Sequence, residues 1–248
     1  MMKQIKNLSL FIAILLSAAM FSACDEDFLK SDEPTGLAIG YIELIDDGYF
    51  FQLDNGKKMY PGDVSLMPNY KPEEGKRVIV YFQSLSQKIA GYDYNIKVIH
   101  IESILTKEII SLTADNVEEI GEDRVNITGL WIANGCLTIE FQMEGTRNPA
   151  KKHFINLVKN ELEEPEQQKE GYLSLELRHN AYDDPAHEIL NGLVSFTLPE
   201  SGELPQNGFI IKAESIYEGA KYYKVELPES SLDAISLRHY MPEIVQVR

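Results

Sequence analysis

Cysteine is scarce in this 248-residue sequence, which contains only Cys24 and Cys136. Cys24 lies at the end of the N-terminal apolar segment, so Cys136 is the only cysteine in the rest of the chain. No internal disulfide could then form, although an extracytoplasmic compartment would permit one. Packing of an apolar core must therefore stabilise the folded chain.

Basic residues are few as well. The sequence has 23 Lys and Arg against 39 Asp and Glu, and its formal net charge is −16. Removal of residues 1–23 would take away Lys3 and Lys6 and no acid, which leaves a net charge of −18. Nucleic-acid binding depends on basic side chains that neutralise phosphates, and anionic lipid headgroups also need a basic face. The composition therefore argues against a nucleic-acid partner and leaves membrane attachment to a lipid.

The N-terminal apolar run, Leu8–Met20, is shorter than the roughly 20 residues that a membrane-spanning helix needs. With a basic start and small residues at its end, residues 1–23 have the layout of a secretory signal peptide. Ser22-Ala23-Cys24 resembles the lipobox of bacterial lipoproteins, which implies a diacylglycerol and usually an N-acyl chain such as palmitate on Cys24. Two such signals suffice for stable anchoring. The alternative is an ordinary signal peptide with a chance cysteine.

Residues 24–35 combine the lipidated cysteine with an acidic tether that we do not expect to fold. An acidic stretch beside the cysteine resembles the surface-export tether of some outer-membrane lipoproteins. We therefore expect an anchor in the outer membrane, with the body facing the cell surface in preference to the periplasm. A plain solvated spacer on a periplasm-facing protein is the alternative.

The body of the chain is predicted to be all-β. Residues 36–110 contain about five short strands, the scale of a small OB-like barrel. Asp54-Asn55-Gly56 marks a hairpin between two of them. Residues 111–123 are predicted to be a linker, with a possible helical turn. Residues 124–248 contain about seven further strands, with a second hairpin at Asn134-Gly135, and are predicted to form a β-sandwich.

No sequence pattern for catalysis or a cofactor is found. Cys136 begins a strand with an apolar face and is expected to be a buried, inert thiol. A polar cluster around His179, Asp183 and His187 suggests a metal-dependent hydrolase as a remote alternative, but its spacing matches no familiar zinc pattern. His153 and His179 have apolar neighbours, so a core histidine bonded to the backbone is the default for each.

Aromatic residues of the first domain raise the question of a binding surface, because OB barrels bind oligonucleotides or oligosaccharides on an exposed face. The candidate residues on this surface are Tyr49, Phe51, Tyr60, Tyr70, Tyr92 and Tyr94. Core packing is the competing explanation for these rings. Arg178 and His179, at the end of an alternating strand, are the candidate binding residues of the second domain.

Several stretches together resemble the NigD-like lipoproteins, which pair an N-terminal OB-type domain with a C-terminal β-sandwich. Besides Cys24, the stretches that carry the resemblance are Tyr49–Gly56, Gly75–Val78, Leu130–Phe141, Lys152–Val158 and Leu175–Asn180. The family name comes from a bacteriocin-immunity role inferred from gene context, and the resemblance implies no catalytic residues.

We therefore expect a non-enzymatic, membrane-anchored protein of the cell envelope that binds a protein or a glycan, with a possible immunity-like role. The alternative is a structural accessory subunit of an outer-membrane complex.

Overall fold

The computed structural model describes residues 34–200 and 202–227, so the predicted signal peptide, Cys24 and nearly all of the tether lie outside the described residues. The described chain is almost entirely β-structure, as the sequence predicts. Within these two ranges, no helix is long and apolar enough to cross a membrane.

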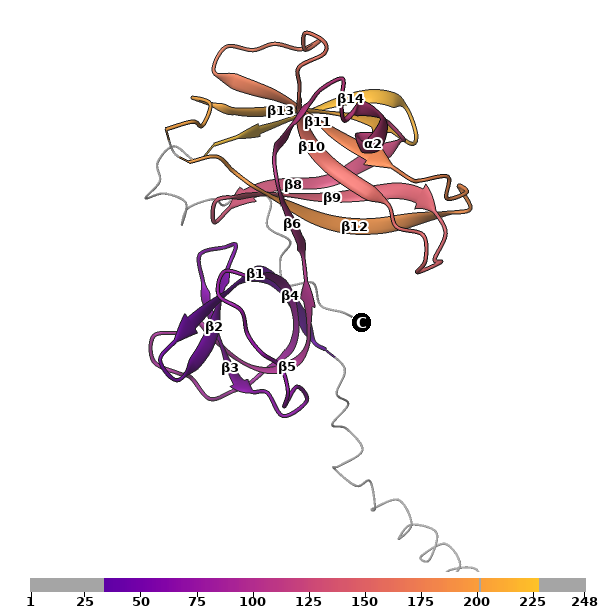
Figure 1. The fold of residues 1–248 in the computed structure, drawn as a ribbon. Coiled ribbons are helices and arrows are strands. Elements are labelled where there is room, and N and C mark those ends of the chain that lie inside the picture. The colour runs from indigo at the N-terminus through magenta and orange to yellow at the C-terminus, as the bar shows by residue number, and fades with distance from the viewer. Residues whose placement is uncertain (1–33, 201, 228–248) are drawn as a thin grey trace, which may run out of the picture. The chain divides into compact units, whose positions relative to one another are not determined.

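The first five strands close into a barrel in the order β1-β2-β3-β5-β4 (Figure 1). Their bounds are β1 Gly36–Ile45, β2 Gly48–Leu53, β3 Lys58–Asp63, β4 Arg77–Ser84 and β5 Tyr94–Ser103. Strand β1 closes the barrel because it pairs with β2 through Gly40–Ile45 and with β4 through Gly36–Tyr41. The two pairings overlap at Gly40 and Tyr41, and a Cβ atom on Gly40 would lie 2.4 Å from the carbonyl oxygen of Gln52. The predicted OB-like barrel is confirmed.

The barrel interior is filled by the inward-facing side chains of all five strands. Alternation along the strands produces this core, because residues two apart point to the same face of a strand. Its most buried members are Ile42, Phe51, Met59, Val78, Val80, Ile96 and Val98. Complete burial of one such side chain stabilises the fold by about 1.5–3 kcal/mol.

The remaining strands form a two-sheet sandwich, which confirms the second predicted fold. One sheet has the order β14-β13-β11-β10-β7 and the other β6-β12-β9-β8. Their bounds are β6 Leu105–Glu108, β7 Ile110–Leu112, β8 Val125–Ala133, β9 Cys136–Gly145, β10 Phe154–Asn160, β11 Tyr172–Asn180, β12 Glu188–Thr197, β13 Gly208–Ser215 and β14 Gly219–Glu226.

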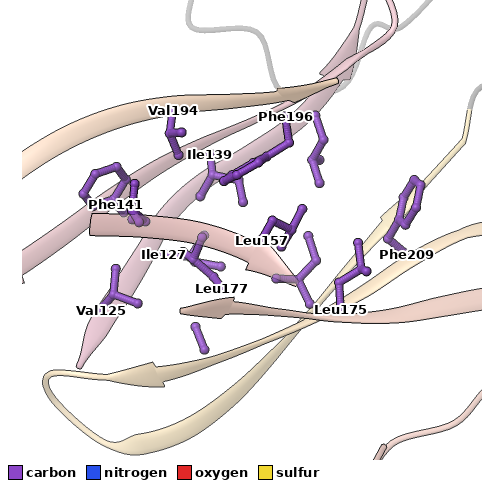
Figure 2. Close-up of a cluster of buried hydrophobic side chains, with 14 of the residues drawn as sticks. Val125, Ile127, Ile139, Phe141, Leu157, Leu175, Leu177, Val194, Phe196 and Phe209 are labelled. Carbon is purple, nitrogen blue, oxygen red and sulfur yellow. The ribbon is translucent and has the colours of Figure 1, made fainter. Parts of the chain in front are cut away.

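The sandwich core lies between these two sheets (Figure 2). Phe141 and Phe196 come from the four-stranded sheet, and Leu157, Leu177 and Phe209 from the five-stranded sheet. On β12, a glycine makes room for one of these rings. A Cβ atom on Gly192 would lie 2.3 Å from the Phe141 ring.

The border between the two domains lies earlier than the predicted end of the barrel at residue 110. Strand β6 pairs in parallel with β12, and β7 pairs in parallel with β10, so both belong to the sandwich. Parallel pairing needs no local turn, which explains why the sequence shows no signal for it. The predicted helical turn of the linker is the short helix α2, Val117–Ile120.

A buried ion pair joins residues of the barrel to residues of the sandwich. Asp54, in the β2–β3 turn, accepts hydrogen bonds from Arg77 Nη1 at 2.5 Å and Nη2 at 2.9 Å. The same carboxylate accepts hydrogen bonds from Trp131 Nε1 at 2.8 Å and Asn134 Nδ2 at 3.2 Å. Arg77 Nη2 also donates to Thr138 Oγ1 at 2.8 Å. The two predicted hairpin turns therefore meet at one carboxylate.

Candidate functional site

The aromatic residues predicted to form one platform are divided between the inside and the outside of the barrel. Phe51 is fully buried in the core, so its assignment as an exposed binding residue is wrong. Tyr49, Tyr70 and Tyr94 pack against the same core cluster. Burial, with a smaller contribution from Tyr70, raises the pKa of Tyr49 to about 12. These four rings are explained by packing.

A second set of rings lies on the outer face of the barrel. Phe50 of β2, Tyr60 of β3 and Tyr92 of the β4–β5 loop are each half-buried. The ring centroids of Phe50 and Tyr92 are 5.6 Å apart, and those of Tyr60 and Tyr92 are 5.0 Å apart. The exposed Lys58 places its Nζ 5.2 Å from the centroid of Phe50. We call these four residues the barrel aromatic surface.

Backbone hydrogen bonds fix the loop that carries Tyr92. The Lys58 N–H donates to the Asp93 carboxylate at 2.8 Å, and the Asp93 N–H donates to the Lys58 carbonyl at 2.8 Å. The loop is therefore attached to the beginning of β3, and Tyr92 is held beside Tyr60. The rings expose apolar faces, Lys58 adds a positive charge, and Tyr60 and Tyr92 bring phenol groups.

Sequence reasoning identified Tyr60 and Tyr92 but missed Phe50. The signal that could have found it is the alternation along Tyr49-Phe50-Phe51, which puts the middle residue on the opposite face from its neighbours. The surface also lies where OB barrels bind their ligands, along strands 2 and 3 and the loop between strands 4 and 5.

Arg178 and His179, the candidate residues of the sandwich, point to opposite faces of β11 and do not form a common site. The Arg178 guanidinium is neutralised by Glu176 at 2.6 Å and Glu122 at 3.2 Å. His179 is only 1% exposed, so its assignment as a ligand-binding residue is wrong.

His179 belongs to a chain of buried polar groups. Its Nδ1 lies 3.2 Å from the Arg124 carbonyl, and its Nε2 lies 2.8 Å from His153 Nδ1. His153 Nε2 lies 3.1 Å from Asp184 Oδ2. Asp184 also accepts hydrogen bonds from the Thr146 N–H at 2.6 Å and the Thr146 hydroxyl at 2.8 Å. The predicted backbone partner of His179 is confirmed, whereas the ring of His153 bonds to side chains.

The residues of the remote hydrolase hypothesis are not assembled into a metal site. Asp183 and His187 are exposed, whereas His179 is buried. Among residues 34–200 and 202–227, no group of three His, Cys, Asp or Glu side chains is placed to hold a metal ion. Cys136 is buried, as expected, and burial is the main cause that raises the pKa of its thiol.

Comparison with known families matches both domains. Residues 43–104 match the NigD-like N-terminal OB domain, and residues 108–227 match the NigD-like C-terminal β-sandwich domain. Comparison with curated proteins finds no match.

Solved structures with a similar fold include proteins from Bacteroides and Parabacteroides species. A protein of unknown function from Bacteroides vulgatus is 27% identical, with a TM-score of 0.65, and the match covers 80% of this chain and 93% of that one. A protein from Parabacteroides distasonis, provisionally described as toxin-related, is 33% identical, with a TM-score of 0.59 and coverage of 77% and 92%. A NigD-like immunity protein from Bacteroides caccae has a TM-score of 0.57 at 15% identity, with coverage of 77% and 97%, and shares the fold. The chain therefore belongs to the NigD-like family, with an N-terminal OB domain and a C-terminal β-sandwich domain.

Proposed function

We propose that this protein is a non-enzymatic binding protein of the cell envelope, held at the outer membrane by a lipid on Cys24. Its ligand, a protein or a glycan, binds to the barrel aromatic surface. The observation that carries the proposal is the position of Phe50, Tyr60 and Tyr92 on the outside of a barrel whose interior is already filled by other side chains.

The composition of this surface supports the ligand class. Tyrosine combines an apolar ring with a polar hydroxyl and loses little conformational freedom on binding, so it suits recognition of proteins and sugars. Nucleic acid also stacks on aromatic rings, but an acidic chain of net charge −16 repels its phosphates. A protein or a glycan is therefore the favoured ligand.

The name of the Bacteroides caccae structure suggests an immunity role as one form of this function. In that role the ligand is a toxin, which the lipid-anchored protein intercepts at the envelope. The acidic charge of the chain would speed association with a basic toxin. Deletion of the gene would then sensitise the producing cell to that toxin.

The binding proposal is tested with chain 25–248, produced without the signal peptide and the lipidated cysteine, on a glycan array and against envelope fractions. The triple variant F50A/Y60A/Y92A removes the rings and leaves the barrel core intact. The matched control is Y217A, which removes a ring that is 60% exposed on the sandwich. We expect the triple variant to lose binding and Y217A to retain it. Equal binding by the wild type, the triple variant and Y217A would contradict the proposal.

The anchor is tested separately in cells. The full chain should incorporate labelled palmitate, and the variant C24S should not. Protease applied to intact cells should cleave the body of the protein if it faces the surface. Protection from protease, together with a stable co-purifying envelope complex, would instead support the accessory-subunit alternative.

A further inference from the structure

The chain of groups from the Arg124 carbonyl through His179, His153 and Asp184 to Thr146 is called here the histidine clasp. Its members come from five places in the sandwich. Arg124 precedes β8, His179 lies at the end of β11, and His153 precedes β10. Asp184 lies in the β11–β12 turn, and Thr146 follows β9. The side chains of His153 and Asp184 are 8% and 1% exposed, so water does not replace these hydrogen bonds.

The geometry determines how many protons the clasp carries. The Arg124 carbonyl can only accept, so His179 carries its proton on Nδ1 at that contact. The Asp184 carboxylate likewise can only accept, so His153 carries a proton on Nε2. One further proton must lie between the facing nitrogens, His153 Nδ1 and His179 Nε2, to make their 2.8 Å contact a hydrogen bond. The histidine pair therefore holds a single positive charge opposite the Asp184 carboxylate.

A second positive charge on the pair, from one more proton, is incompatible with this arrangement. Both facing nitrogens would then carry hydrogens, and the 2.8 Å contact would become repulsive. Burial, and next the charge of His153, lower the pKa of His179, in the direction that this repulsion requires. Acid therefore acts against the folded form of the clasp.

The β11–β12 turn stores backbone strain that the clasp opposes. Tyr182 has φ +46° and Asp183 has φ +57°, both in the left-handed region. Such conformations cost about 1–3 kcal/mol each and persist where surrounding contacts impose them. Asp184 follows directly, and its carboxylate is held by His153 and Thr146. Tyr182, which is 48% exposed, is thereby presented at the surface.

We propose that the histidine clasp is an acid-sensitive device, which holds the β11–β12 turn in its strained conformation with one shared proton and releases the turn when a second proton binds. This inference is independent of the barrel aromatic surface. It assigns to the sandwich a conformational response to pH that changes how residues 181–187 are presented.

Other ionisable groups lie beside the clasp along the chain. Asp123, from the segment before β8, raises the pKa of His179 slightly, and its carboxylate accepts a hydrogen bond from the Ala181 N–H at 2.8 Å. Lys152, Arg124 and His187 are exposed residues. His187 lies in the same turn but bonds through its backbone N–H to the Gly145 carbonyl at 3.3 Å. It is therefore a matched control for the buried histidines.

The test is amide hydrogen exchange, followed by NMR between pH 7.5 and 5 and corrected for the intrinsic rate at each pH. The reporters are the N–H groups of Thr146, Ala181 and Asp184, and amides in the middle of β9 are the reference. In the wild type we expect reporter protection to fall below pH 6.5 and to approach a loss of about tenfold per pH unit near pH 5, as for an opening coupled to one proton. Protection of the reference amides should not follow this change.

Variants separate the clasp from the surrounding turn. H187Q should respond to pH like the wild type, whereas H153Q should show weaker protection and a smaller dependence on pH, because His179 remains buried without a second imidazole beside it. A response that is lost in H187Q, or wild-type reporters that stay protected at pH 5, would overturn the proposal. If H153Q does not fold, NMR of the histidine side chains in the wild type tests the proposal instead. The proposal requires three ring protons on the pair at pH 7, one more than two neutral rings carry. Two neutral rings would refute it.

Discussion

The Asp54 carboxylate of the barrel accepts a 2.8 Å hydrogen bond from the indole nitrogen of Trp131 in the sandwich. Each group is buried, with Asp54 at 4% and Trp131 at 6% exposure. Arg77 completes the ion pair and donates to Thr138 of the sandwich, and Asn134 of the sandwich also donates to the Asp54 carboxylate. An apolar cluster that includes Ile39, Ile104 and Ala133 surrounds the indole ring. We conclude that the barrel and the sandwich stabilise each other.

Replacement of Asp54 should therefore destabilise both domains. The variant D54A leaves the Arg77 guanidinium buried without its counter-ion, which typically costs about 3–5 kcal/mol. Urea unfolding followed by the fluorescence of Trp131, the only tryptophan, measures the change. The exposed Asp47 provides the control D47A, which should change the free energy of unfolding by less than about 0.5 kcal/mol. Equal stability of the two variants would show that the junction contributes little.

The contact between Gly192 and Phe141 predicts an overpacked core in G192A. The new methyl group would lie 2.3 Å from the Phe141 ring, and overpacking of this kind costs about 1–3 kcal/mol. The double variant G192A/F141L should recover part of the lost stability, because leucine lacks the ring atoms that the new methyl group would contact. A double-mutant cycle without coupling between the two positions would contradict this packing.

Lys107 should stabilise the sandwich through its amino group. The Nζ donates to the Ile155 carbonyl at 2.8 Å and to the Asn156 side-chain oxygen, and it lies 4.1 Å from the Phe154 ring centroid. Strand β7 pairs with β10 only from Val158 onward. Lys107 therefore supplies hydrogen bonds to the earlier part of β10, which has no β7 partner. We expect K107M to cost about 1–3 kcal/mol by thermal or urea unfolding. K159M, at an exposed lysine of β10, should have little effect.

The stability of the protein should decline in acid. The pKa of folded His179 is lowered by burial and by His153, so below about pH 6.5 the unfolded chain binds more protons than the folded chain. For Asp184, burial opposes ionisation, but hydrogen bonds from His153 and Thr146 outweigh it and lower the pKa. The contribution of Asp184 to the stability of the folded state is present above about pH 4 and is lost as the pH falls through its folded pKa.

Urea unfolding at pH 6.5, 5.75 and 5 measures this dependence. The free energy of unfolding should decrease at each step, and the decrease should be smaller in H179Q, which has no imidazole at that position. H100Q, at an exposed histidine of the barrel, should follow the wild type. A stability that rises toward pH 5 would contradict the sign of the His179 shift.

Strand alternation explains why most of the fold could be predicted from the sequence. Leu173, Leu175 and Leu177 mark one face of β11 by their spacing alone, and Asn134-Gly135 marks the hairpin between β8 and β9. The pairing of β6 with β12 could not be predicted, because parallel neighbours far apart in sequence leave no turn between them. The same limit applies to the histidine clasp, whose residues Thr146, His153, His179 and Asp184 are brought together only by the folded sheets.

The aromatic residues show the limit of composition as a guide to a binding site. Phe50 and Phe51 are adjacent and chemically identical, yet Phe51 is buried and Phe50 faces outward. The alternation in β2 separates them, but the partnership of Phe50 with Tyr92 depends on the β4–β5 loop folding back onto β3. That contact is visible only in the structure.

The most direct test of the proposed function is site-specific photo-cross-linking in intact cells that express the full chain. A photoreactive residue at Lys58 samples the barrel aromatic surface, and one at the exposed Lys224 of β14 samples the sandwich. The proposal predicts a discrete adduct from position 58 that is absent from position 224 and is lost when F50A and Y92A are added. Adducts that form equally at both positions, or that persist without the two rings, would contradict binding at the barrel aromatic surface.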